Sequence, residues 1–342
     1  MDLKKYYSKK HLSLEIAEKE SWSKFNHKSE RSYRNVDDDW KVKLLEMPEK
    51  EKTRMLFKYA YEGNLKMVKA IATSGGALCD VDFLDKDYNS ALMYAVKGGK
   101  KEVVEYIAKR TKRINAVNHN CMSPLQLAVR KNRLDLVAIL VDNGACIDIL
   151  DKDNRTVIYD AVAENNLNMI NALKLNGCDI NVYDKTGISP LMYATEQTNR
   201  QMAMCELIRL GANVNYQPPT TYKNALMHAI LHDNRSAMDI LIKNGIDINA
   251  KDKFGRNALM YCAKIGNREG IRVLISRGAD IFAKDVEGKT AFDIANYNCA
   301  RGSAEILAKA EKIYKSNISE EQKRQELKKF AKHNKVENSC AK

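Results

Sequence analysis

No paired cysteine motif occurs in this 342-residue chain, and that absence limits the kinds of protein it can be. The cysteines stand singly, with no Cys-x-x-Cys and no cysteine–histidine cluster, at Cys79, Cys121, Cys146, Cys178, Cys205, Cys262, Cys299 and Cys340. Zinc sites and small disulfide-bonded domains need closer and more regular spacings. We therefore expect reduced, mostly buried thiols and a cytoplasmic, reducing location.

Long apolar runs are also missing. No stretch of about 18 apolar residues is present, so the sequence predicts no membrane span. The basic residues 1–10 are followed by no apolar stretch, so we expect no cleavable secretory signal peptide. Delivery into a host cell without such a signal stays open as a hypothesis.

Motifs for catalysis and cofactor binding are absent as well. The chain has no Gly-x-x-x-x-Gly-Lys-[Ser/Thr] phosphate loop, no Gly-x-Ser-x-Gly turn and no His-Glu-x-x-His motif. His228 and His232 are four residues apart, but only Asp233 and Asp239 lie near them in sequence as further ligands. We expect no enzyme activity, no cofactor and no metal site.

What the sequence does contain is a repeat. Eight anchor residues recur at intervals of 36, 33, 33, 33, 35, 33 and 33 residues: Leu56, Leu92, Leu125, Ile158, Leu191, Leu226, Leu259 and Phe292. A unit of this length cannot bury its own apolar face, so neighbouring units must stack. The sequence therefore predicts a solenoid that binds along an extended surface.

The units share local signals. A Ser or Thr two residues before the anchor can cap a first helix, at Ser90, Ser123, Thr156, Ser189 and Thr290. A small residue three positions after the anchor lets helices approach closely, at Ala95, Ala128, Ala161, Ala194, Ala229, Cys262 and Ala295. A second amphipathic helix follows and ends at a glycine in most units. Each unit therefore predicts a helix pair.

These units resemble the ankyrin repeat. The fifth contains Asp184-Lys185-Thr186-Gly187-Ile188-Ser189-Pro190-Leu191-Met192-Tyr193-Ala194, and Gly211-Ala212-Asn213-Val214-Asn215 follows its second helix. The resemblance covers about residues 48–316. It implies an all-α solenoid of about eight stacked, ankyrin-type helix-turn-helix repeats with β-hairpin fingers. The family's histidine after the anchor is absent throughout, so its hydrogen bonds between units must be replaced or lost. The unit of Leu191 carries two extra residues, near Asn199 and in the finger at 216–221.

The two ends lie outside the repeats. Residues 1–47 form a polar extension in which 38–47 could be a capping helix on the first unit. Residues 317–342 are a charged helix or tail that starts with a capping-box pattern, Ser319 to Gln322. We expect this last helix to be loosely docked or frayed, and a short linear signal for a partner or an export system is the alternative.

The net charge of +13 bears on the partner. Residues 301–342 hold 11 basic and 6 acidic side chains, and the repeats carry only a diffuse basic surplus. No zinc finger, helix-turn-helix or aromatic-basic platform accompanies the charge, so nucleic-acid binding is disfavoured. An acidic protein partner or a membrane surface fits this charge better.

The resemblance implies that fingertips and first helices line a concave binding groove. Mapped by position, the candidate partner-binding residues are Lys152, Arg155, Lys185, Ile188, Glu196, Tyr222, Lys223, Leu231, His232, Phe254, Arg256, Lys264, Ile265 and Tyr297. Several place apolar or aromatic groups where a stack needs none for its core, as interface hot spots do.

We therefore expect a monomeric protein–protein interaction module that acts as an adaptor, a scaffold or a bacterial effector. An inhibitor or immunity-type regulator of a specific enzyme is the alternative. A nucleic-acid binder or an enzyme that works through the termini is the least favoured hypothesis.

Overall fold

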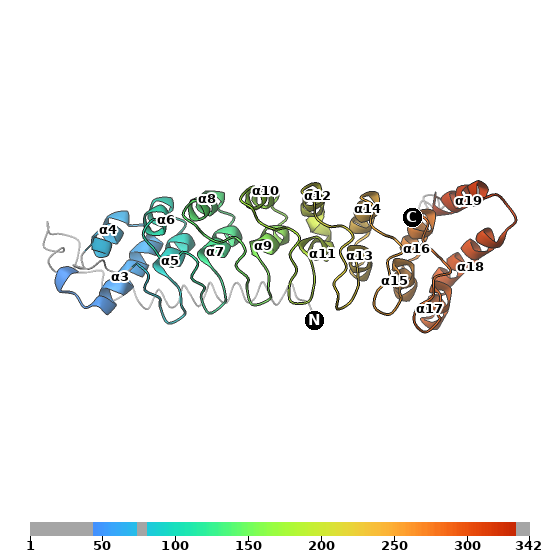
Figure 1. Ribbon diagram of the computed structural model, residues 1–342, viewed down its shortest axis with the longest axis horizontal. Helices are drawn as coiled ribbons and strands as arrows, with labels where there is room; N and C mark the ends of the chain where they lie inside the picture. Colours follow the sequence, from blue (N-terminus) through green and yellow to red (C-terminus); the bar gives the residue numbers. More distant parts are fainter. Residues whose placement is uncertain (1–43, 74–80, 333–342) are drawn as a thin grey trace, which may run out of the picture.

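The computed structural model describes residues 44–73 and 81–332, and it shows helix pairs in a single row (Figure 1). The first helices form one layer: α3 (Glu49–Glu62), α5 (Ala91–Gly98), α7 (Pro124–Arg130), α9 (Val157–Ala163), α11 (Pro190–Thr195), α13 (Ala225–Leu231), α15 (Ala258–Ile265) and α17 (Ala291–Tyr297). The second helices form the other: α4 (Leu65–Thr73), α6 (Lys101–Ala108), α8 (Leu134–Asp142), α10 (Leu167–Leu175), α12 (Gln201–Arg209), α14 (Arg235–Lys243), α16 (Arg268–Ser276) and α18 (Arg301–Lys315). We number these pairs as units 1 to 8.

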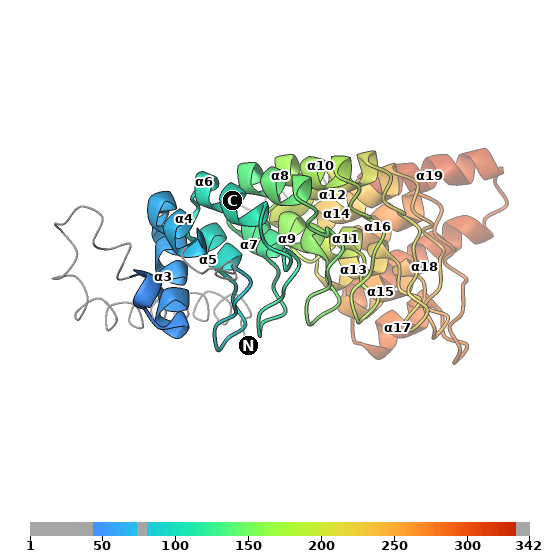
Figure 2. The same cartoon turned by 60° about the vertical axis from the view of Figure 1, so that its left-hand side comes forward.

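Each first helix packs on the first helix of the next unit, which confirms the predicted all-α solenoid. A finger, meaning the loop that precedes each first helix from unit 2 onward, projects away from both layers on the first-helix side (Figures 1 and 2). Within residues 81–332 the fingers contain no β-strand, only an isolated bridge between Leu84 and Ser90. The fingers are therefore hairpin-shaped loops, each closed by a few hydrogen bonds.

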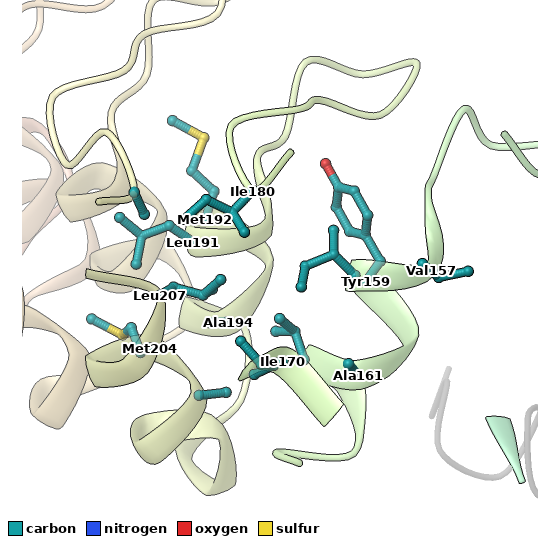
Figure 3. Close-up of a cluster of buried hydrophobic side chains, with 14 of the residues drawn as sticks. Val157, Tyr159, Ala161, Ile170, Ile180, Leu191, Met192, Ala194, Met204 and Leu207 are labelled. Atoms are coloured by element: carbon teal, nitrogen blue, oxygen red, sulfur yellow. The ribbon is translucent and has the colours of Figure 1, made fainter. Parts of the chain in front are cut away.

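The predicted anchors make the core. Seven of them are almost completely buried, from Leu56 to Leu259, and only Phe292 in the last unit is half-buried. The small residues three positions later are also buried. Ala194 is one of them and lies within the packed cluster of Figure 3, where its short side chain allows helices to pack closely. In that view Leu191 and Met192 lie over Met204 and Leu207 of the same unit. Close packing of this kind makes each unit dependent on its neighbours.

Side-chain caps fix where the first helices begin. Ser90, Ser123, Ser189 and Thr290 each accept a hydrogen bond from the backbone N–H three residues later, as predicted. The prediction was wrong for Thr156, whose buried hydroxyl makes no cap bond and has no partner. In units 6 and 7 asparagines make the cap instead, Asn224 and Asn257. An asparagine side chain has both an acceptor for the cap and an NH₂ donor to spare.

That spare donor makes a hydrogen bond to the next finger. Asn224 Nδ2 donates to the carbonyl of Asp247 at 3.0 Å, and Asn257 Nδ2 donates to Asp280 at 3.2 Å, both in the next finger. In unit 3 Gln126 donates to Ile149 at 3.4 Å, and in unit 4 the Tyr159 hydroxyl donates to Ile188 at 2.6 Å. Different side chains thus make the hydrogen bonds between units in different parts of the stack.

The other expectations about the helices have mixed outcomes. Glycines end the second helices with left-handed backbone, as Gly144 and Gly177 do with φ near 90°. The extra residue near Asn199 lies in a 3₁₀ turn, η1 (Thr198–Arg200). Of the cysteines that the structure describes, Cys146, Cys205 and Cys299 are exposed, so the expectation of mostly buried thiols was wrong for these three.

Both ends of the row are covered. At the start, Leu44 is helical and buried, and Lys52 Nζ donates to the carbonyl of Leu45 at 3.0 Å; the rest of the predicted N-terminal extension, 1–43, lies outside the described residues. At the other end α19 (Glu320–Lys332) folds back onto α16 and α18 and buries Leu327. This helix is docked by an apolar contact.

Candidate partner-binding surface

A carboxylate organises most of the fingers. In unit 7 the Asp252 carboxylate accepts hydrogen bonds from the backbone N–H groups of Phe254 and Arg256, both at 2.8 Å. The Asp252 N–H donates to the carbonyl of Arg256 at 2.9 Å and closes the loop. The same pattern occurs at Asp85, Asn118, Asp151, Asp184 and Asp285. The fingertips are therefore fixed by an internal acceptor and can present their side chains without further support.

Backbone hydrogen bonds join some neighbouring fingertips. The Lys185 N–H donates to Asp153 O at 3.0 Å, and the Val286 N–H donates to Phe254 O at 3.0 Å. Comparable bonds link His119 to Asp87 and Lys253 to Thr221. Together, the fingertips and the exposed sides of the first helices make one face of the row, which we call the finger face.

In units 4 and 5 the predicted residues are largely engaged within the fold. The Arg155 guanidinium donates to Asp184 Oδ2 at 2.8 and 3.1 Å and lies 4.7 Å from the Tyr193 ring centroid. Lys185 pairs with Asp153 at 2.7 Å. Ile188 is half-buried against the core, and Lys152 is exposed. This part of the finger face is polar and already paired.

Units 5 and 6 bring a carboxylate and two imidazoles together. Glu196 is half-buried at the end of α11, and burial raises the pKa of its carboxyl group. The nearby His232 and Arg200 have the opposite, smaller effect and lower this pKa. His232 is exposed, whereas His228 is half-buried and its Nδ1 has no hydrogen-bond partner. Burial lowers the pKa of His228 to about 4. Leu231 is exposed on the same helix, α13.

The finger of unit 6 is built differently because Pro218 stands where the other fingers have Asp or Asn. Its carbonyl accepts from the N–H groups of Thr221 and Tyr222. Tyr222 takes a positive φ of 54° and remains exposed, and Lys223 Nζ lies 5.9 Å from the Tyr261 ring centroid. A tyrosine in left-handed backbone is costly and uncommon, so this finger holds Tyr222 outward at some expense in stability.

Units 7 and 8 also present exposed aromatic groups on the finger face. Phe254 is 41% exposed, and Tyr297 is 79% exposed at the end of α17. Phe254, Arg256, Lys264 and Tyr297 line a hollow of about 190 Å³. Ile265 is exposed on α15 but does not line it.

Comparison with known proteins agrees with this geometry. A family model described as ankyrin repeats (3 copies) matches residues 55–153, 158–252 and 226–318, which is most of the chain. The chain belongs to the ankyrin repeat family. Ankyrin repeats are protein–protein interaction modules, so the coarse function of this chain is binding a protein partner.

Other ankyrin repeat proteins match over shorter stretches. Ankyrin repeat and SOCS box protein 6 is 37% identical over 51 residues in Mus musculus, which is 15% of this chain and 12% of that protein. The Homo sapiens protein of the same name is 38% identical over 47 residues, 14% and 11% of the two chains. The match thus spans about an eighth or less of these relatives. The solved ankyrin repeat domain of Bcl-3, a member of the IkappaB family, is similar in fold, with a TM-score of 0.60 and 24% identity over 65% of this chain and all of that one.

Two further residues line the hollow and were not predicted from their position in the repeat. Lys289 and Val286 lie on the finger of unit 8, where Lys289 Nζ is 5.1 Å from the Tyr297 ring centroid and Val286 is 71% exposed. The mapping took fingertips only through unit 7. Applying the same register to the Asp285 finger would have found both residues.

The described residues contain no candidate for a metal site or a membrane-spanning helix. Within residues 44–73 and 81–332 no group of three or more His, Cys, Asp or Glu side chains could hold a metal ion. In the same ranges, no helix combines the length and apolar character that a membrane crossing requires.

Proposed function

We propose that this ankyrin repeat chain binds its protein partner through the finger face of units 5 to 8. The main support is the exposure of five predicted apolar residues, whose side chains are not needed by the core: Tyr222, Leu231, Phe254, Ile265 and Tyr297. Exposed aromatic groups next to arginine and lysine are typical of interface hot spots. Unit 5, at the edge of this surface, contributes mainly polar, already paired side chains.

We propose that the protein acts as an adaptor or scaffold, and that it works in a reducing, cytoplasmic compartment, which includes the cytoplasm of a host cell for a delivered effector. Three exposed free thiols, Cys146, Cys205 and Cys299, support a reducing location. In an oxidising compartment such thiols would form intermolecular disulfides.

The test removes four finger-face side chains together. Leu231, Phe254, Arg256 and Tyr297 are replaced by alanine, and partner capture from lysate is compared with wild type by pull-down and mass spectrometry. A matched variant replaces four exposed residues around the second-helix layer, Leu134, Leu175, Met202 and Arg277. We expect the first variant to lose the captured protein and the matched variant to keep it.

Two results would contradict the proposal. Loss of the helical circular-dichroism signal in the first variant would place these residues in the core. Equal capture by both variants, with folding intact, would move the interface away from the finger face. If the captured protein is an enzyme that the chain silences at equal molar ratio, the inhibitor alternative replaces the adaptor role.

A further inference from the structure

We propose that the hollow between the fingers of units 7 and 8 binds a carboxylate side chain of the partner, next to an apolar one. This proposal rests on the function proposed above and names the partner chemistry that one part of the finger face selects. The occupant is an acidic peptide segment in which Glu or Asp alternates with an apolar residue.

The hollow has an apolar interior and two aromatic walls. Met260, Ile294 and Tyr261 are buried at its inner side, and Phe254 and Tyr297 stand exposed at its edges. Its volume of about 190 Å³ is the size of a few side-chain groups rather than a whole small-molecule ligand. An apolar residue of a peptide could therefore bury surface here while its neighbour reaches the rim.

The walls are held in place by close backbone contacts. Gly255 has a φ of 73°, and a Cβ built on it would lie 3.2 Å from the backbone nitrogen of Val286 in the next finger. The Val286 N–H donates to the carbonyl of Phe254 at 3.0 Å across the same junction. The two fingers are thus joined beside the hollow, and a ligand would meet a site that is already formed.

Unused hydrogen-bond donors point to an anion. The Arg256 guanidinium lies 4.5 Å from the Phe254 ring centroid, and its nearest carboxylate contact is Asp252 Oδ2 at 3.7 Å, beyond hydrogen-bond range. That oxygen already accepts from the Tyr261 hydroxyl at 2.7 Å. Lys264 is exposed and pairs with no acidic side chain in the part of the chain that the structure describes. The hollow is therefore lined by Lys264, which has no acidic partner there, and by Arg256, whose only ion pair is longer than a hydrogen bond.

In unit 4 the arginine at the equivalent position is bound to a carboxylate of the next finger. Arg155 also stands four residues after the finger aspartate, but it donates twice to Asp184 of the next finger, at 2.8 and 3.1 Å. The corresponding carboxylate for Arg256 is Asp285. Like Asp184, it accepts two N–H groups of its own finger through Oδ1, but unlike Asp184 it accepts no hydrogen bond from the preceding arginine. In unit 7 the arginine therefore lacks a hydrogen-bonded partner in the next finger and keeps only the 3.7 Å ion pair with buried Asp252 of its own finger.

The local charge favours a single negative charge. Three basic side chains, Arg256, Lys264 and Lys289, line the hollow together with two acidic ones, Asp285 and Glu287. Lys289 is paired with Glu287 at 2.7 Å, so the surplus lies on Arg256 and Lys264. A carboxylate matches this surplus, whereas a phosphate dianion would meet more repulsion from the two acidic residues.

The experiment measures binding of labelled peptides to the full chain by fluorescence anisotropy at low ionic strength. The probe is a short peptide that alternates glutamate and leucine, and its controls carry glutamine or phosphoserine in place of glutamate. The test variant is R256Q/K264Q. The matched variant, R277Q/K309Q, makes the same charge change at two exposed residues of the same units that do not line the hollow.

We expect the glutamate peptide to bind wild type and R277Q/K309Q equally, and R256Q/K264Q at least about tenfold more weakly, since charge-assisted hydrogen bonds are lost. Glutamine should weaken binding to wild type by a similar factor. Equal weakening by both variants, or no preference for glutamate over glutamine, would overturn the proposal. Tighter binding of the phosphoserine peptide would reassign the hollow to phosphate.

The test distinguishes failure of this assignment from failure of the proposed function. If R256Q/K264Q still captures the partner while the four-alanine variant does not, the finger face remains the interface and the carboxylate assignment is wrong. If both variants capture the partner normally, the finger-face proposal itself fails.

Discussion

At the scale of single residues, the same arginine position has two different roles along the stack. Arg155 donates to Asp184, whose side chain is only 2% exposed, whereas the guanidinium of Arg256 makes no comparable bond. We predict that Arg155→Ala lowers the free energy of unfolding by about 1 to 2 kcal/mol, because a buried carboxylate loses its ion pair. Arg256→Ala should change it by less than about 0.5 kcal/mol, because its 3.7 Å contact with buried Asp252 is not a hydrogen bond and Asp252 keeps its bonds to the Tyr261 hydroxyl and the finger backbone. Urea unfolding of the two variants measures both, and equal losses would contradict the distinction.

His228 predicts a pH effect on stability. Burial lowers its pKa from 6.5 to about 4, with smaller contributions from Lys223 and His232. Between these values the unfolded chain binds a proton that the folded chain does not, so stability falls as pH falls through this window. Relative to His228→Leu, wild type should lose about 2 kcal/mol between pH 7 and pH 5. Urea unfolding at several pH values checks this, and a pH-independent difference between the two proteins would show that His228 does not titrate as described.

At the scale of elements, a side-chain ladder runs along the loops that enter the fingers. Asn181 accepts from the Asn213 N–H at 2.8 Å and donates to Gly211 O at 3.3 Å, and Asn215 and Asn249 repeat this pattern in later units. Asp148 occupies the same position between units 4 and 5. Its carboxylate makes no hydrogen bond with the residues that the structure describes. One junction of the ladder is therefore incomplete.

Completing the ladder should stabilise the stack. We predict that Asp148→Asn raises the free energy of unfolding by about 0.5 to 1 kcal/mol, because the new amide can donate to the carbonyl of Gly177. The reverse change at an intact junction, Asn181→Asp, should lower it by a similar amount. Urea unfolding measures both, and a loss of stability in Asp148→Asn would refute the explanation.

The elements were largely predictable from the sequence because their signals are local. The anchors, the small residues after them and the terminating glycines each act within one helix pair. Thr156 failed as a cap because the presence of a hydroxyl does not fix the rotamer that a cap bond requires. The Asn224 and Asn257 caps were missed because only Ser and Thr were considered, although asparagine caps helices as well. The burial of Leu327 depends on contacts with α16, far away in sequence, and could not be read from the charged pattern of α19.

At the scale of the whole molecule, the position of each candidate residue within its repeat predicts that it lies on one face. It does not predict which of these side chains are already bonded to a neighbouring unit. Arg155 and Arg256 occupy equivalent positions in sequence, and only the neighbouring finger decides which one is engaged. The hollow was missed for the same reason, since it forms between two units and exists in neither alone. Sequence periodicity describes one unit at a time, whereas binding surfaces of a solenoid arise between units.

The central claim is that the finger face of units 5 to 8 is where the partner docks. The most direct measurement places a photo-crosslinking phenylalanine analogue at Tyr297 or Phe254, and separately at Leu175 or Met202 on the second-helix layer. Each variant is irradiated with the captured partner, and the adducts are identified by mass spectrometry. We predict adducts from Tyr297 and Phe254 and none from Leu175 and Met202. Adducts only from the second-helix positions would contradict the claim.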